Sequence, residues 1–228
     1  MCGRFSLYEK NMTSEEFEER FGFEMPDDWE IRPAYNISPY GSIPVIFRGE
    51  NNQAQIRPMQ WQLVPSFAKE FKSKYSMFNT RVETFEKQGF WPRLLQTSRC
   101  IIPANNFFEW AKADGQKIPY KFELKDQSLM GIGGIYSIWR DGDGNAFYST
   151  SMITVPANDV VGEIHSRMPF ILPPEFEKPW LDKKQRDINF LKPIINPYPP
   201  EKMQAFRVSQ QVNNSRNDSP DLITPLKM

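Results

Sequence analysis

The chain has few of the residues that usually build metal centres and disulfide frameworks. Its 228 residues include two cysteines, Cys2 and Cys100, and one histidine, His165. Two cysteines cannot supply the several bridges of a disulfide-rich secreted domain, and with one histidine they are too few for a typical zinc site. We therefore expect free thiols, no bound metal and no cofactor.

Long apolar runs are missing as well. No stretch approaches the roughly 18 apolar residues of a membrane span. The N-terminus lacks the basic and then apolar pattern of a secretory signal. We therefore expect a cytoplasmic protein that makes no contact with a membrane.

The chain also lacks an excess of charge, with 28 basic and 28 acidic side chains. The charge is unevenly spread, however, because residues 57–99 carry eight basic side chains against Glu70, Glu83 and Glu86. The same segment is rich in aromatic residues. Interleaved basic and aromatic residues suit a nucleic-acid strand with exposed bases. A solvated charged face over an aromatic core is the alternative, and this segment alone favours it.

Twelve glycines against 20 prolines argue against long uninterrupted helices. The length suits one mixed, β-rich domain over residues 1–228, of the α+β class. Periodicity and capping residues predict short helices at 13–22, 84–96, 158–164 and 174–191. Branched and aromatic runs between turn signals predict strands, and those from residue 99 onward should form an antiparallel meander. The predicted strands are 43–47, 55–64, 99–103, 107–110, 119–124, 129–139, 146–155 and 204–212.

The most informative residue is Cys2. A methionine before a small residue is normally removed, which would leave Cys2 with an α-amine and a thiol two carbons apart. The amine titrates near ~7.7–8.0 and the thiol near ~8.5, so both have a nucleophilic fraction at neutral pH. The amine can form a Schiff base with an aldehyde, and the sulfur can then close a thiazolidine ring. A small residue at a frayed terminus is the alternative.

Three polar segments could support such chemistry. Alternation in residues 79–83 would place Asn79, Arg81 and Glu83 on one face of an extended segment. The amide and guanidinium there could bind a sugar or a phosphate, although an arginine–glutamate ion pair at a strand edge explains the pattern equally well.

Glu109 lies between Phe108 and Trp110. Partial burial there would raise its pKa toward the range useful for proton transfer, whereas an exposed glutamate at a strand end is the alternative. His165 is the only side chain that normally titrates near neutral pH, so it is a candidate for protonating an imine or a sugar oxygen. A lone histidine is more often structural.

Seven motifs, in this order, resemble the SRAP family (SOS response-associated peptidase, or abasic site processing proteins). They span nearly the whole chain, and together they are far more specific than any one of them. The matching pieces are 1–5 (MCGRF), 35–39 (YNISP), 61–65 (WQLVP), 79–84 (NTRVET), 100–110 (CIIPANNFFEW), 164–169 (IHSRMP) and 208–218 (VSQQVNNSRND).

This resemblance implies a single domain with antiparallel strands in a barrel-like arrangement, flanked by short helices. It also implies a protein that binds single-stranded DNA and traps abasic sites as a thiazolidine crosslink, which protects the lesion in the DNA damage response. We expect the protein to be a monomer. The implied reactive residues are Cys2, Asn79, Glu109 and His165. The implied DNA-binding residues are Arg4, Asn36, Pro39, Trp61, Phe67, Arg81, Thr154 and Arg167.

The chain departs from the family pattern at two positions. Gln62 stands where the family usually has glycine, and Phe67 replaces a tryptophan that can stack on a base. Phenylalanine offers less stacking area, so binding could be weaker. The reactive positions are unaffected.

Two other functions remain open. An N-terminal-nucleophile hydrolase, a peptidase or amidase, would also use a terminal cysteine with its own α-amine as base. A single-strand-binding module would not need Cys2 to stay on DNA. Lyase activity is a further possible side reaction, because β-elimination from the Schiff base would cut the strand.

Overall fold

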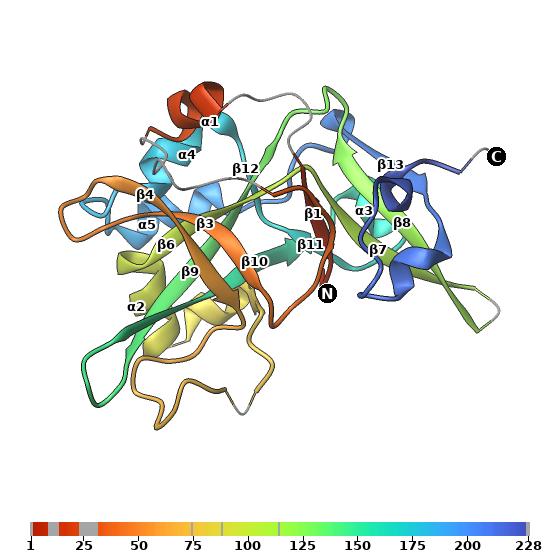
Figure 1. The fold of residues 1–228 in the computed structure, drawn as a ribbon. Helices are drawn as coiled ribbons and strands as arrows, with labels where there is room; N and C mark the ends of the chain where they lie inside the picture. The colour runs from red at the N-terminus through yellow and green to blue at the C-terminus, as the bar shows by residue number, and fades with distance from the viewer. Residues whose placement is uncertain are drawn as a thin grey trace.

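The computed structural model describes residues 2–8, 14–22, 32–73, 75–87, 89–113 and 115–226. Two sheets dominate it, and Figure 1 shows strands β3, β4, β6, β9 and β10 on the left and β7, β8 and β13 on the right. One apolar core contains buried residues of both sheets. The fold is therefore mostly β with a few short helices, as the sequence predicts.

The larger sheet closes into a five-stranded barrel, in the order β10-β4-β3-β6-β9, because β9 also pairs with β10. β11, β12 and β5 add to the outside of this barrel. Most pairs are antiparallel, but β4 and β5 both run parallel to β10. The strands are β3 (Ser42–Arg48), β4 (Ala54–Trp61), β5 (Asn79–Arg81), β6 (Arg99–Ala104), β9 (Met130–Arg140), β10 (Ala146–Pro156), β11 (Arg167–Pro169) and β12 (Ile171–Leu172).

The smaller sheet has the order β13-β8-β7-β1-β2. Its central strand pair, β7 and β1, brings the N-terminus beside the middle of the chain. The strands are β1 (Phe5–Leu7), β2 (Ala34–Ile37), β7 (Asn106–Ala113), β8 (Gln116–Leu124) and β13 (Met203–Arg207).

The predicted meander after residue 99 is wrong, because its strands divide between the two sheets. β6 and β9 are neighbours in the barrel, whereas the β7–β8 hairpin between them belongs to the smaller sheet. The switch occurs at Asn105, whose backbone N–H donates to Ser6 O (2.9 Å) and whose Oδ1 accepts from the Tyr8 backbone N–H (2.6 Å). Contacts with the distant β1 therefore redirect the chain.

The helices are shorter than predicted. The segment predicted as one helix over 84–96 forms a 3₁₀ helix, η1 (Val82–Glu86), and then α2 (Phe90–Thr97), separated near Gly89, whose φ is +100°. The segment 174–191 likewise divides into α4 (Pro174–Leu181) and α5 (Ile188–Leu191). The others are α1 (Ser14–Phe21), α3 (Asp159–Gly162) and the short 3₁₀ turns η2 (Lys192–Ile194), η3 (Pro200–Lys202), η4 (Gln210–Asn213) and η5 (Pro220–Ile223). The last predicted strand, 204–212, therefore ends early and continues into η4.

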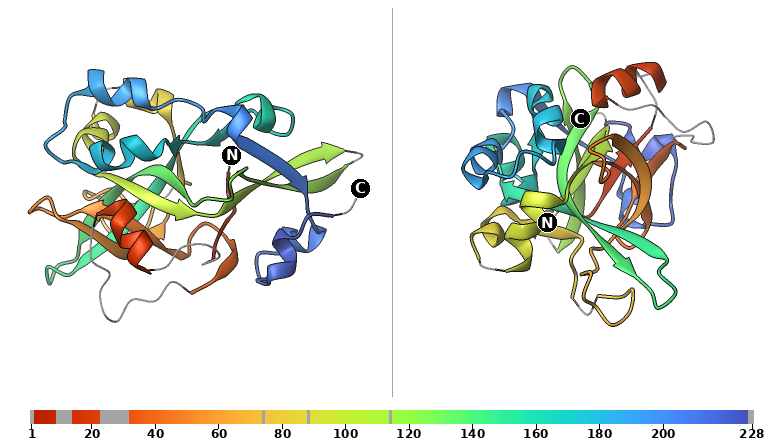
Figure 2. Two further views of the ribbon diagram at one scale, coloured as in Figure 1. Left: turned by 90° about the horizontal axis from the view of Figure 1, so that it is seen from above. Right: turned by 90° about the vertical axis from the view of Figure 1, so that its left-hand side faces the viewer.

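Helices α2, α4 and α5 lie together on one side of the barrel (Figure 2). Among the described residues, no helix is long and apolar enough to cross a membrane.

Candidate functional site

The four predicted reactive residues lie together. The Asn79 side-chain amide donates a hydrogen bond to the Cys2 carbonyl (2.6 Å). The Glu109 carboxylate lies 3.9 Å from Nδ1 of His165 and is close enough to Cys2 to raise the pKa of its thiol. The cluster therefore combines groups from four separate segments of the chain.

Strand register explains the contact between Cys2 and Glu109. Phe5 of β1 pairs with Phe107 of β7 in the antiparallel direction. The Phe108 backbone N–H then donates to Arg4 O (2.9 Å). Moving back from Phe5 to Cys2 on one strand therefore means moving forward from Phe107 to Glu109 on the other.

Asn79 and His165 reach the cluster through β10. Asn79 pairs with Met152 at the start of β5, and Arg167 of β11 pairs with Pro156. His165 lies two residues before Arg167, just after α3. The larger sheet thus supplies Asn79 from β5 and His165 from the segment before β11, and the smaller sheet supplies Glu109 from β7 and Cys2 from the segment before β1.

The Cys2 side chain is fully buried. Its Sγ donates weakly to Arg4 O at 3.6 Å. Burial raises the pKa of the thiol well above its ordinary value, and the negative charge of Glu109 raises it further. The sulfur is therefore held as a neutral thiol in this conformation, and it must lose its proton to react as a nucleophile.

Glu109 is 3% exposed, and its burial raises its pKa to about 7. The direction agrees with what its position between Phe108 and Trp110 predicts. A carboxyl group with this pKa exists in both protonation states at neutral pH. It can therefore accept a proton in one step and return it in another.

The Arg167 backbone holds the His165 ring at Nδ1. This nitrogen lies 3.0 Å from the Arg167 backbone nitrogen and 3.1 Å from the Arg167 carbonyl oxygen, so it can accept from the first or, when protonated, donate to the second. Partial burial lowers its pKa, which keeps the ring neutral at neutral pH. The ring is therefore fixed beside Glu109, with Nδ1 3.9 Å from the carboxylate.

Arg4 occupies a fixed place beside the cluster. Its Nη1 donates to Oδ1 of Asn36 (2.6 Å) and to the Val212 carbonyl (2.8 Å), and its guanidinium lies 5.7 Å from the centre of the Trp110 ring. Nε of Arg4, Nε of Arg167 and Oδ1 of Asn79 are buried polar atoms with no hydrogen-bond partner in the described part of the chain. Buried atoms of this kind favour a ligand that can satisfy them.

Asn36 connects the N-terminal strand to the C-terminal motif. Its amide nitrogen donates to the carbonyls of Val212 (3.4 Å), Asn214 (3.0 Å) and Asn217 (2.7 Å), while its Oδ1 accepts from Arg4. The side chain is only 5% exposed. Asn36 therefore positions Arg4, and in this structure its side chain is buried and already engaged rather than open for the predicted contact with DNA.

Replacing Asn36 by aspartate tests this positioning role. A carboxylate cannot donate to the three carbonyls, so we expect the free energy of unfolding to fall by about 2–3 kcal/mol in a urea titration. The control is Asn213→Asp, because Asn213 is exposed and a carboxylate there can still accept from Nε1 of Trp110. An equal loss in the two variants would contradict the role of Asn36.

Two other predicted DNA contacts are inaccessible in this structure. Trp61 is fully buried: its Nε1 donates to Phe78 O (2.8 Å), and its ring packs edge-on against Phe5 at 5.1 Å. Thr154 is fully buried in β10, where its Oγ1 lies 3.5 Å from the Thr80 carbonyl. Both residues therefore support the elements that carry Cys2 and Asn79, and neither presents a surface to a base.

The remaining predicted contacts are accessible. Arg81 and Phe67 are exposed, and Pro39 is half-buried. Glu83 does not share the face of Arg81, because β5 ends at Arg81 and η1 begins. Glu83 instead receives two hydrogen bonds from Arg167 (2.5 and 3.0 Å), which hold the pKa of Glu83 below its usual range. Arg167 also donates to Thr154 O (2.6 Å), so the His165 segment is fastened to β10 and η1.

Sequence reasoning missed the role of Gln62. Its Nε2 donates to Tyr75 O (2.5 Å), and its Oε1 accepts from the Met77 backbone N–H (2.8 Å). These bonds hold the loop that leads into Asn79. An amide side chain in the apolar run 61–65 is the signal that could have indicated this role. Among the described residues, no group of three or more His, Cys, Asp or Glu side chains could hold a metal ion.

Comparisons with known proteins identify the family. The family model described as SOS response associated peptidase (SRAP) matches residues 1–215. The chain is similar to the abasic site processing protein YoqW of Bacillus subtilis (strain 168), with 37% identity over 227 residues, 98% of this chain and 99% of that protein. It is also similar to the abasic site processing protein HMCES of Mus musculus, with 31% identity over 274 residues, 99% of this chain and 76% of that protein.

The fold is shared with solved structures. An X-ray structure of a protein from Bacteroides thetaiotaomicron superposes with a TM-score of 0.81 at 24% identity, covering 99% of this chain and all of that one. A second, from Bordetella bronchiseptica, has a TM-score of 0.75 at 22% identity and covers 91% of this chain. With a family model that matches most of its length, the chain belongs to the SOS response associated peptidase (SRAP) family.

Proposed function

We propose that this protein binds single-stranded DNA in the cytoplasm and traps abasic sites covalently through Cys2, after removal of Met1. The observation that carries the proposal is the cluster of Asn79, Glu109 and His165 around Cys2. A terminal amine and thiol held beside two proton carriers suit the capture of an aldehyde. The names of the relatives, abasic site processing proteins, support DNA with abasic sites as the partner.

The first step opens the sugar and forms an imine. The abasic sugar is mostly a closed ring, so a proton donor at the ring oxygen increases the fraction of free aldehyde. His165 is suited to this task in its protonated form, which its lowered pKa makes a stronger acid. The Cys2 amine then attacks the aldehyde carbon, a C=N bond forms and one water leaves. Oδ1 of Asn79, which is buried, could accept a hydrogen bond from the amine.

The second step closes the thiazolidine ring. The sulfur of Cys2 forms a bond to the imine carbon, and the electron pair of the C=N bond moves to nitrogen. The thiol proton must leave sulfur and a proton must reach nitrogen. Glu109, with a pKa of about 7, can accept the first and supply the second. No proton is gained or lost overall.

Positive side chains near the cluster suit the flanking phosphates. Arg81 is exposed on β5, and Arg4 and Arg167 each keep a buried Nε without a partner in the described part of the chain. Phe67 is 74% exposed and could stack on a base. We expect each arginine to contribute to affinity in a salt-dependent way.

Intact-protein mass spectrometry tests the proposal. Protein that has lost Met1 is incubated with a single-stranded oligonucleotide carrying one abasic site, then heated. We expect a mass equal to protein plus oligonucleotide minus one water, and a peptide map that places the adduct on Cys2. An oligonucleotide with an uncleavable, aldehyde-free sugar analogue is the control and should give no adduct. Unmodified protein that lacks Met1 would contradict the proposal and favour the amide hydrolase, and cut DNA without an adduct would indicate a lyase.

A further inference from the structure

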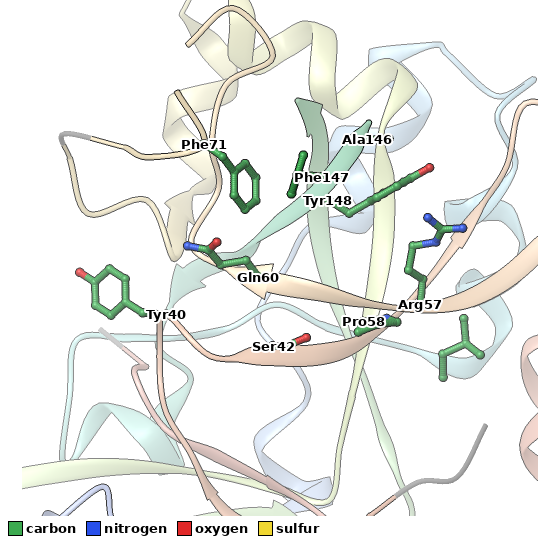
Figure 3. Close-up of a pocket in the computed structure, with 10 residues that line it drawn as sticks. Tyr40, Ser42, Arg57, Pro58, Gln60, Phe71, Ala146, Phe147 and Tyr148 are labelled. Atoms are coloured by element: carbon green, nitrogen blue, oxygen red, sulfur yellow. The ribbon is translucent and has the colours of Figure 1, made fainter. Parts of the chain in front are cut away.

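A second recess lies beside β4, apart from the four reactive side chains. It has a volume of about 600 Å³ and is bordered by β3, β4, β10 and the loop that carries Phe71 (Figure 3). Figure 3 shows Phe71, Phe147 and Tyr148 along one side and Ser42 and Pro58 along the other. We call it the β4 pocket; its lining residues are Tyr40, Ser42, Ile56, Arg57, Pro58, Gln60, Phe71, Ala146, Phe147 and Tyr148.

Aromatic rings in the β4 pocket are arranged as a surface for flat groups. Phe71 lies 5.2 Å from Phe147, with 38° between the ring planes. The Arg57 guanidinium makes a cation–π contact with Tyr148, 4.2 Å from the centre of the ring. This contact favours one position of the guanidinium. Tyr40 is 62% exposed and Phe147 39% exposed. Exposed aromatic faces of this kind are where the bases of an unpaired strand stack.

Charge and hydrogen-bonding groups in the β4 pocket also suit a nucleotide. Arg57 is its only charged lining residue within the described chain, so a phosphate meets one positive charge and no carboxylate in the lining. Lys69 and Lys72 are exposed beside Phe71, with Glu70 between them. The Gln60 amide and the Ser42 hydroxyl make no hydrogen bond to described protein groups and can pair with the edge of a base.

Tyr40, which lines the β4 pocket, also contacts the segment before Asn79. Its ring packs against Phe78 at 6.3 Å, and Phe78 directly precedes Asn79. Its backbone N–H donates to Trp61 O (2.9 Å), and its φ is +72°, a conformation that a bulky side chain rarely adopts. The backbone of Tyr40 is therefore fixed next to the segment that leads into Asn79, while its ring stays exposed.

We propose that the β4 pocket binds an unpaired base of the same DNA strand, a few nucleotides from the abasic site. This inference rests on the proposed function, because the abasic nucleotide bound at Cys2 defines the position of the DNA strand. The strand would pass over Tyr40 and place one base against the exposed Phe147 ring, with Gln60 at the edge of the base and the phosphate near Arg57. The pocket would raise affinity for long strands and take no part in the covalent chemistry.

Fluorescence anisotropy with undamaged single strands of two lengths tests this proposal independently of crosslinking. We expect Phe147→Ala and Arg57→Gln each to weaken binding of a long oligothymidine at least about fivefold, and binding of a short one by less than twofold. The matched control is Phe190→Ala, since Phe190 is 40% exposed on α5 and does not line the β4 pocket. Circular dichroism melting verifies that each variant is folded.

The covalent reaction separates the two proposals. With a short abasic oligonucleotide at saturating concentration, Phe147→Ala should form the crosslink at the wild-type rate. If wild type crosslinks but both pocket variants bind long strands as tightly as Phe190→Ala, the pocket proposal is wrong and the proposed function stands. If wild type never crosslinks yet the variants lose affinity for long strands, the pocket binds DNA and the proposed function is wrong.

Discussion

Cys2→Ser is expected to form no detectable heat-stable crosslink with abasic DNA. The variant keeps its α-amine, so it can still form an imine, but it lacks the sulfur that closes the thiazolidine ring. Borohydride should therefore trap the variant on DNA, whereas heating without borohydride should release it. Denaturing gel electrophoresis with and without the reductant measures both outcomes, and complete loss of the heat-stable band is the expected magnitude.

The matched control is Cys100→Ala. Cys100 is the other free thiol, and it is as completely buried as Cys2, with its Sγ 3.4 Å from Oγ1 of Thr150. Burial also raises the pKa of its thiol. We expect crosslinking by Cys100→Ala to equal that of wild type, because the proposed removal of Met1 would leave an α-amine on Cys2 and none on Cys100. A heat-stable product from Cys2→Ser would refute the role of the sulfur.

Glu109→Gln is expected to slow crosslink formation about 100-fold or more, the usual contribution of a positioned proton carrier. The amide fills nearly the same space but cannot carry the thiol proton away. The wild-type rate should change with an apparent pKa of about 7, the value of Glu109, and this titration should vanish in the variant. Single-turnover kinetics from pH 5 to pH 9 on a labelled abasic oligonucleotide measure both effects.

Stability provides a second readout for the same substitution. The pKa of Glu109 is about 7 in the folded protein and 4.5 in its ordinary state, so the folded protein holds the proton more tightly. The contribution of Glu109 to the free energy of unfolding is therefore fully present at low pH. It falls by about 3 kcal/mol as the pH rises from 4.5 through 7. Glu109→Gln should lack this decrease and be the more stable protein at pH 8 in urea titrations.

Glu123→Gln is the control for both measurements. Glu123 is another buried carboxylate of the smaller sheet, but it pairs with Lys121 at 2.8 Å and does not face Cys2. We expect its crosslinking rate to stay within about threefold of wild type, because it carries no proton in the reaction. If the two variants slowed the reaction equally, Glu109 would be a structural residue and the proton-transfer role would be incorrect.

Local signals predicted the position of most strands. Runs of branched and aromatic residues between turn signals correspond to β3, β6, β8, β9 and β10, although several ends differ by a few residues. The partner of each strand did not follow from these signals. Asn105 redirects the chain through bonds to β1, and Gly89 interrupts a predicted helix with a positive φ. The first effect depends on contacts with a distant strand, and the second depends on one backbone dihedral angle. A hydrophobic pattern along the sequence contains neither kind of information.

The sequence by itself determined the chemistry that each residue carries. The aminothiol potential of Cys2 and the apolar neighbours of Glu109 are covalent or local properties, so they are visible without a fold. Only the tertiary structure decided which groups meet and which are accessible. The β1–β7 register brings Glu109 to Cys2, whereas packing buries Asn36, Trp61 and Thr154 behind the cluster. The reason is that strand pairing and burial depend on contacts between segments far apart in the chain, and a motif read along one segment does not specify them.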